Sequence, residues 1–300
     1  MPTTPDHPGA RTPRAAPLRI GYGSNGFTDH RLHEALTVLA DLGYDGVAVT
    51  PDTGHLDPYE PGLPVRVDAL AAHADRLGLA LTVETGARYV IDPHRKHAPT
   101  LLDADPAPRL DYLRRCLRIA AGLGAPTMAL WSGAAPPGLA PAAVWDRLVR
   151  ATEELLDDAA RHGVALGFEP EPGMFVDTIA GYERLRDLLG APAGFGICLD
   201  LGHCVCTESA AVPDCVARVA ADLVAVQIED MRRGVHEHRE FGTGDIDFPP
   251  VLAALAAAGY TGLVGIELPR HAHAAPAVAA RSLAFLRRAE HAARVPEEAR

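Results

Sequence analysis

The chain has 300 residues, of which 48% are hydrophobic, enough to build the core of one eight-stranded barrel. Its 28 Lys and Arg are outnumbered by 39 Asp and Glu, and the net charge of −11 opposes binding to a nucleic-acid backbone. No apolar run approaches the ~18 residues of a membrane span. An odd number of cysteines without a secretory signal favours reduced thiols and a cytoplasmic protein.

The chain divides into a short leader and one domain. Residues 1–16 combine Pro, Thr, Asp, His and Arg without an apolar stretch, so we expect a disordered N-terminal leader. No linker interrupts residues 17–295, which we assign to a single domain.

Short apolar runs alternate with amphipathic segments along this domain. The expected strands are Leu18–Tyr22, Gly46–Thr50, Ala80–Glu84, Thr127–Trp131, Val164–Glu169, Phe195–Asp200, Leu223–Ile228 and Leu263–Glu267. The expected helices are Asp29–Leu42, Val65–Leu77, Pro108–Leu123, Ala142–His162, Thr178–Leu189, Ala210–Asp222, Phe248–Ala258 and Ala275–Ala293. Near-continuous apolar strands are typical of sheets covered by helices on both faces. The alternation predicts an α/β fold, the (β/α)8 TIM barrel.

The alternative fold is an open, doubly wound sheet that binds a dinucleotide. Gly21, Gly23 and Gly26 match the G-x-G-x-x-G pattern of such sheets. No acidic residue closes the next strand, Gly46–Thr50, as that function requires.

Four strands in succession end in Glu169, Asp200, Gln227 and Glu267. Parallel barrel strands bring their carboxyl ends to one rim, so we expect these side chains to lie together. Carboxylate and amide oxygens are hard ligands, which predicts one divalent metal ion, Mn²⁺ or Mg²⁺. We expect the glutamates Glu169 and Glu267 to be the catalytic acid and base as well. Rim salt bridges are the structural alternative, and Glu171 is a weaker competitor for the ligand role because it follows the strand.

Further polar residues would surround a substrate. His203 follows Asp200 by three residues, and the charged segment after residue 228 could bind the oxygens of an acidic or phosphorylated substrate. The expected substrate-binding residues are His203, Arg233, His236, His238, Glu84 and Trp131. The alternatives are a solvated charged loop, a second metal site at His236 and His238, and packing roles for Glu84 and Trp131.

At these residues the chain resembles the xylose isomerase-like TIM-barrel superfamily, also called the sugar phosphate isomerase/epimerase family. The resemblance spans roughly residues 17–290 and is carried by Glu169-Pro, Asp200-x-Gly-His203, the run from Ala225 to Asp230, the run from Phe241 to Phe248, and Gly265-Ile-Glu267. It implies a divalent metal with ligands at Glu169, Asp200 and Glu267, proton transfer by the two glutamates, and substrate contact by His203. Gln227 departs from the histidine of many members.

The leading hypothesis is therefore a metal-dependent sugar or sugar-phosphate isomerase or epimerase that works through an enediolate. The second hypothesis is a lyase of the dehydroshikimate dehydratase type, and the third is a non-catalytic metabolite-binding barrel. The acidic charge and Gln227 oppose an apurinic endonuclease of the same superfamily. We expect a small polyhydroxylated or keto substrate, with or without phosphate, and no nucleic-acid or membrane partner. The sequence leaves a homo-oligomer open.

Overall fold

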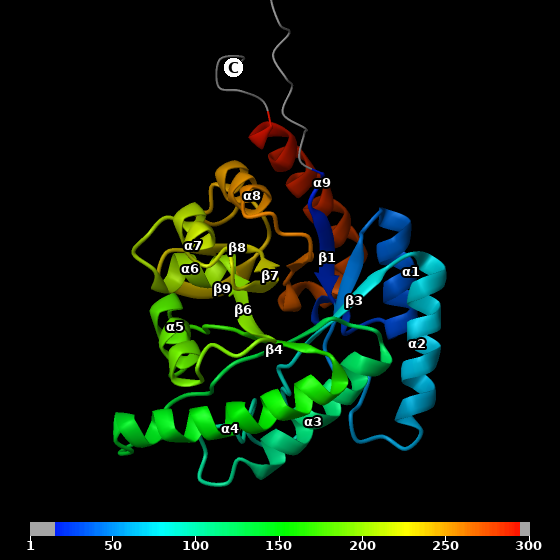
Figure 1. Cartoon of the computed structure of the whole chain (residues 1–300). Coiled ribbons are helices and arrows are strands. Elements are labelled where there is room, and N and C mark those ends of the chain that lie inside the picture. Colours follow the sequence, from blue (N-terminus) through cyan, green and yellow to red (C-terminus); the bar gives the residue numbers. More distant parts are fainter. Residues whose placement is uncertain (1–15, 295–300) are drawn as a thin grey trace, which may run out of the picture.

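A computed structural model of the chain describes residues 16–294, and they form a closed parallel barrel surrounded by helices (Figure 1). The barrel strands are β1 (Arg19–Gly23), β2 (Gly46–Val49), β3 (Ala80–Glu84), β4 (Thr127–Leu130), β5 (Ala165–Phe168), β6 (Phe195–Asp200), β7 (Leu223–Ile228) and β10 (Leu263–Ile266). They follow one another around the barrel in chain order, and β10 pairs with β1 to close it. The TIM-barrel prediction is confirmed, and closure excludes the open dinucleotide-binding sheet.

Helices form the outer layer. They are α1 (Leu32–Leu42), α2 (Leu63–Leu77), α3 (Ala107–Gly122), α4 (Pro141–His162), α5 (Ile179–Leu188), α6 (Leu201–Thr207), α7 (Val212–Arg218), α8 (Phe248–Ala257) and α9 (Ala275–Ala293), with short 3-10 turns η1 (Ser24–Phe27) and η2 (Pro269–Ala274). Each packs an apolar face on the barrel, as Leu36 and Leu39 of α1 do. Gly43 and Gly78 adopt left-handed conformations that end α1 and α2, as the sequence indicates.

The region after β6 differs from the prediction. The helix expected over Ala210–Asp222 is present but shorter, as α7, and the chain forms an additional helix, α6, directly after β6 that was not predicted. Asp200 is the reason that α6 begins so early. Its carboxylate accepts a hydrogen bond from the backbone N–H of His203 at 2.8 Å and so caps the new helix.

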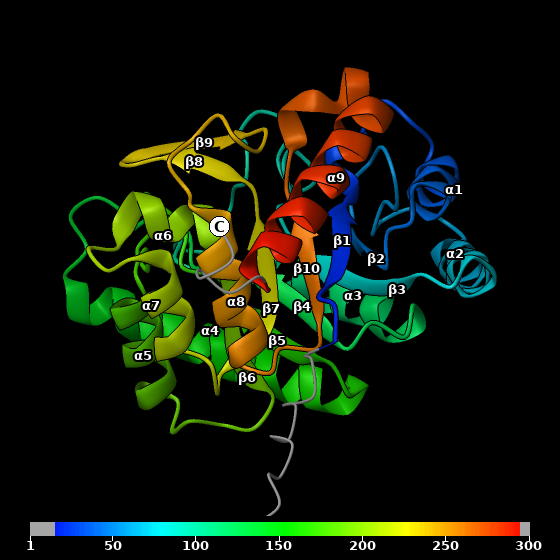
Figure 2. The same ribbon diagram turned by 90° about the horizontal axis from the view of Figure 1, so that it is seen from above.

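The charged segment after β7 was expected to be a loop, but it forms a hairpin of β8 (Asp230–Arg232) and β9 (Val235–Arg239). Its base is built around Asp230, whose Oδ2 accepts hydrogen bonds from the N–H groups of Gly242, Thr243 and Gly244 at 2.8, 3.0 and 2.8 Å. A Cβ at Gly244 would lie 2.2 Å from Asp230 Oδ1, so only glycine fits there. The hairpin lies at one end of the barrel, beside the segment that joins β10 to α9 (Figure 2).

Two expectations concern the ends of the chain. The leader expected over residues 1–16 lies, apart from Ala16, outside the described residues. The barrel and its helices, from Arg19 to Ala293, lie within the range assigned to one domain. Within the described part of the chain, none of the helices is long and apolar enough to cross a membrane.

Candidate active site

Acidic and histidine side chains converge at the carboxyl ends of β6, β7 and β10 and on the hairpin. One potential ligand atom from each of Asp200, Glu229, His238 and Glu267 lies within 4.8 Å of the others. Asp200 and Glu229 are almost wholly buried. Asp200 Oδ2, both carboxylate oxygens of Glu229 and His238 Nδ1 have no hydrogen-bond partner among the described residues. Burying several polar atoms without partners is costly, so the arrangement fits a bound cation.

Glu229 is the residue that sequence reasoning missed. It follows β7 directly, two positions after Gln227, and alternation along an extended chain directs both side chains to the same face. In the sequence, the two-residue spacing from Gln227 could have identified Glu229 as a site residue. The pKa of Glu229 is raised well above its ordinary value. Burial is the largest cause, and the negative charges of Asp200 and Glu267 add to it. A Cβ at residue 202 would lie 1.9 Å from Glu229 Oε1, so Gly202 makes room for this carboxylate.

Glu169 lies beside Asp200 and His203, with ligand atoms again within 4.8 Å of one another. Glu169 Oε1 is 3.5 Å from His203 Nδ1, which also lies 3.2 Å from the carbonyl oxygen of Pro170. Burial is the main cause that raises the pKa of Glu169 well above its ordinary value. Burial also lowers the pKa of His203 to about 4, so this imidazole is neutral at neutral pH. Structure and sequence thus agree in placing Glu169, Asp200 and His203 together.

The hairpin carries two further histidines into the site. His236 Nε2 lies 3.1 Å from His203 Nε2 and 3.7 Å from a carboxylate oxygen of Glu171. His203, His236 and His238 also bring their ring nitrogens within 4.8 Å of one another. Burial, followed by the charge of Glu267, raises the pKa of Glu171 to about 8. The histidines that the sequence assigned to substrate binding therefore lie directly beside the carboxylates of the site.

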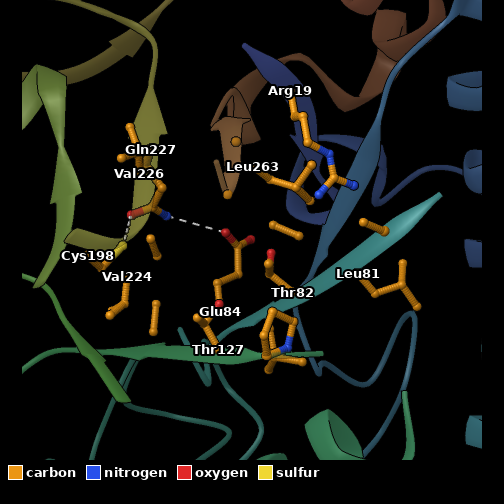
Figure 3. A pocket seen from close by; sticks show the side chains of 18 of the residues that line it. Arg19, Leu81, Thr82, Glu84, Thr127, Cys198, Val224, Val226, Gln227 and Leu263 are labelled. Atoms are coloured by element: carbon orange, nitrogen blue, oxygen red, sulfur yellow. Dashed lines mark hydrogen bonds between the residues drawn. The ribbon is translucent and has the colours of Figure 1, made fainter. Parts of the chain in front are cut away.

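A hydrogen-bond network joins the acidic group to the opposite side of the barrel. Gln227 Nε2 donates to Glu267 Oε2 at 2.8 Å and to Glu84 Oε2 at 3.3 Å, while Cys198 Sγ contacts Gln227 Oε1 at 3.2 Å. Figure 3 shows Glu84 extending from β3 toward Gln227 on β7. Asn25 Nδ2 donates to Glu267 Oε1 at 3.0 Å. Burial, followed by the charge of Glu267, raises the pKa of Glu84 to about 8.

Gln227 thus lies in the predicted cluster, but its amide oxygen is turned toward Cys198. Its predicted role as a ligand would require the amide to turn over. Glu84 lies at the centre of the network. Asp200 and Glu267 lie in the four-residue group, whereas Glu169, predicted as a ligand of the same ion, lies with Asp200 and His203 in a second group.

Two predicted substrate-binding residues lie apart from this network. Arg233 is exposed at the turn of the hairpin and donates to the backbone oxygen of Glu208 at 3.3 Å. Trp131 packs its ring edge to face with His97, at 5.6 Å between centroids, and lies 4.9 Å from the guanidinium carbon of Arg109. These contacts account for both side chains without a substrate, and their binding roles stay predictions.

Comparison with known proteins identifies the fold and family. A sequence-family model described as the xylose isomerase-like TIM barrel matches residues 36–289. Rhizopine catabolism protein MocC of Rhizobium meliloti is 30% identical over 149 residues, which cover 43% of this chain and 45% of that protein. The chain therefore aligns with less than half of this curated relative.

Solved structures of sugar epimerases share the fold. A 3-keto-D-glucoside 4-epimerase from E. coli superposes with a TM-score of 0.73 at 19% identity, covering 91% of this chain and 100% of that one. An L-ribulose 3-epimerase superposes with a TM-score of 0.73 at 20% identity, covering 92% of this chain and 96% of that one. A D-allulose 3-epimerase from Methylomonas sp. superposes with a TM-score of 0.71 at 19% identity, covering 91% of this chain and 98% of that one. The family match spans most of the barrel, and the chain belongs to the xylose isomerase-like TIM barrel family.

Proposed function

We propose that this protein is a divalent-metal-dependent isomerase or epimerase of a small polyhydroxylated keto substrate. The observation that carries the proposal is the group of Asp200, Glu229, His238 and Glu267, the first two buried and the others half-buried, whose ligand atoms lie within 4.8 Å of one another. Several of these atoms have no partner among the described residues. The epimerase identity of the structural neighbours supports the same reaction class, although at 19–20% identity they share only the fold.

The donor set fits a hard divalent ion such as Mn²⁺ or Mg²⁺, because three of the four residues offer carboxylate oxygens. His238 supplies a nitrogen from the hairpin. The family resemblance implies a histidine ligand at the position of Gln227, and we propose that His238 takes over that ligand role here. Glu229 adds a carboxylate that the four-residue prediction lacked, and Gln227 orients Glu267 through the hydrogen bond of 2.8 Å.

Proton transfer is assigned to Glu169 and Glu267. We assign removal of a proton from the carbon next to the substrate carbonyl to Glu169, which lies outside the four-residue group and 3.5 Å from His203. Glu267 returns a proton to the adjacent position or to the opposite face. A divalent cation, when bound, supplies positive charge that favours ionised carboxylates and stabilises negative charge on substrate oxygen. We assign contacts with substrate hydroxyl groups to His203 and His236.

The decisive experiment combines metal analysis with isotope exchange. Protein loaded with Mn²⁺ is incubated in deuterated water with ketoses, ketose phosphates and dehydroshikimate, and NMR follows deuterium incorporation and products. We expect about one ion per chain and exchange at the carbon next to a ketose carbonyl. Loss of water from dehydroshikimate without ketose exchange would assign the lyase reaction instead. Metal binding without exchange into any keto compound would refute the proposed enzyme.

A further inference from the structure

A polar cavity adjoins the active site on the side formed by β1, β2 and β3. It has a volume of about 170 Å³. Its lining residues are Asn25, Thr28, Thr50, Asp52, Thr53, Gly54, His55 and Arg88. Every one of these except Gly54 has a polar side chain, whereas the metal-ligand candidates come from the other half of the barrel. The cavity is therefore a separate part of the site.

Asn25 and Thr50 connect this cavity to the proposed reaction centre. Asn25 donates through Nδ2 to Glu267 at 3.0 Å, and Thr50 donates through its hydroxyl to Glu84. The other amide atom, Asn25 Oδ1, is buried and accepts no hydrogen bond from any described residue. An unpartnered buried acceptor calls for a donor. A substrate held at Glu267 would extend past Asn25 into the cavity.

The charges in the cavity cancel. Arg88 NH1 lies 3.7 Å from Asp52 Oδ2, and Asp52 Oδ1 accepts hydrogen bonds from the backbone N–H and the hydroxyl of Thr53 at 2.6 and 3.1 Å. Burial is the main cause that lowers the pKa of His55, so this ring is neutral at neutral pH. The lining thus carries one positive and one negative charge, which pair with each other, and it also includes three threonines.

We propose that this cavity binds the hydroxyl-bearing end of an unphosphorylated substrate. Hydroxyl groups both donate and accept, so several of them together can donate to Asn25 Oδ1 and the Asp52 carboxylate and accept from Arg88. A phosphate group carries about −1.5 to −2 charges near pH 7 and offers mainly acceptors. It would meet the Asp52 carboxylate and the Asn25 acceptor, with Arg88 as its only cationic partner. The inference rests on the proposed function and narrows the substrate class that the sequence left open.

The size of the cavity agrees with this assignment. At ~30 Å³ per water molecule, about 170 Å³ holds roughly five or six waters. That is room for a few hydroxyl-bearing carbon atoms beyond the reacting ones. Substrate hydroxyls in the cavity would replace water there and reproduce the hydrogen bonds that water makes to polar groups.

The test uses matched pairs of neutral and phosphorylated ketoses, such as D-allulose and D-allulose 6-phosphate, and measures binding to the Mn²⁺-loaded protein by calorimetry. We expect the neutral member of a pair to bind more tightly. Asp52→Asn should weaken neutral-ketose binding roughly tenfold, the cost of a lost hydrogen bond to a charged group, and should improve binding of the phosphate, because Arg88 is then unpaired. Arg88→Met should weaken both members.

Asp92→Asn and Arg95→Met are the matched controls. They break an exposed ion pair of 2.7 Å on the same rim that does not line the cavity, and binding should not change. Tighter binding of the phosphorylated member by the wild type, no binding of any neutral ketose, or indifference to Asp52→Asn would overturn the inference. Binding is read without turnover, so these outcomes are distinct from a failure of isotope exchange, which would count against the proposed function.

Discussion

The amide Nε2 of Gln227 donates a hydrogen bond to Glu267 Oε2 at 2.8 Å, and the amide oxygen faces Cys198. The oxygen therefore points away from the metal site in which it was expected to be a ligand. This relationship separates two roles for Gln227, orientation of Glu267 and ligation of the metal. Gln227→His tests them. An imidazole in the ligand set should shift preference toward zinc or cobalt, because nitrogen suits these ions better than amide oxygen does. Metal competition followed by elemental analysis measures the shift, and an unchanged preference would show that a side chain at position 227 does not reach the metal and only orients Glu267.

Glu229→Gln should change metal affinity and metal-free stability in opposite directions. Loss of a carboxylate ligand should weaken Mn²⁺ binding by roughly 10–100-fold or more, the range known for partners of a metal site. Removal of a buried group whose pKa is raised by burial and by Asp200 should make the metal-free protein more stable at pH 8. Titration calorimetry and thermal unfolding measure the two effects.

Glu237→Gln is the control for that experiment, because Glu237 lies on the same hairpin and pairs with Arg239 and Arg270 at 2.7 and 2.6 Å. We expect little change in metal affinity from it. Equal metal affinity in Glu229→Gln and the wild type would show that Glu229 is not a ligand.

Glu169→Gln and Glu267→Gln should each reduce turnover by roughly 10²–10⁴-fold, because both changes preserve shape while removing a proton-transfer group. Deuterium incorporation into the substrate is the measurement. Glu154→Gln removes a carboxylate from the exposed face of α4, where Glu154 pairs with Arg114, and should leave the rate unchanged. Wild-type exchange in both active-site variants would move the base elsewhere, with His203 and His238 as the next candidates.

Metal-free protein should lose stability between about pH 6.5 and pH 8.5. Burial raises the pKa of Glu84 to about 8, so its contribution to stability is complete below the ordinary carboxyl pKa and is lost as the pH rises through about 8. Glu171, also with a pKa of about 8, acts in the same direction. His203, with a pKa near 4, acts oppositely, since its contribution is complete above about pH 6.5 and is lost on acidification.

Thermal unfolding after chelator treatment measures this dependence. Each such carboxyl contributes a loss of roughly 1–2 kcal/mol over the interval, so the unfolding midpoint should fall by about 3 °C or more. Added Mn²⁺ should reduce the dependence of the unfolding midpoint on pH, because a cation favours ionised carboxylates. A midpoint that rises with pH in the metal-free protein would contradict the assigned protonation states.

The barrel could be predicted from the sequence because its signals are local: apolar runs of strand length, amphipathic segments between them and closing glycines. Glu169, Asp200 and Glu267 could be predicted because strand ends share one rim in a closed barrel. The hairpin of β8 and β9 could not, because its strands are charged and partly exposed and so lack the apolar alternation of a strand. That failure also hid the approach of His238 to Asp200 and Glu229, which depends on how the hairpin folds back over the barrel.

Closure of the barrel through β1 and β10 has a consequence for synthesis of the protein. Asn25 and Glu267 meet across 242 positions of the chain, and neither can bind the other until the last strand has left the ribosome. Ribosomes extend the chain at about 5–20 residues per second, so strand β1 waits roughly ten seconds or more for β10, with one edge unpaired. Such exposed edges invite association with other chains. During this interval the nascent protein has neither a complete acidic site nor a closed sheet, and we expect chaperones to act on it before metal can bind.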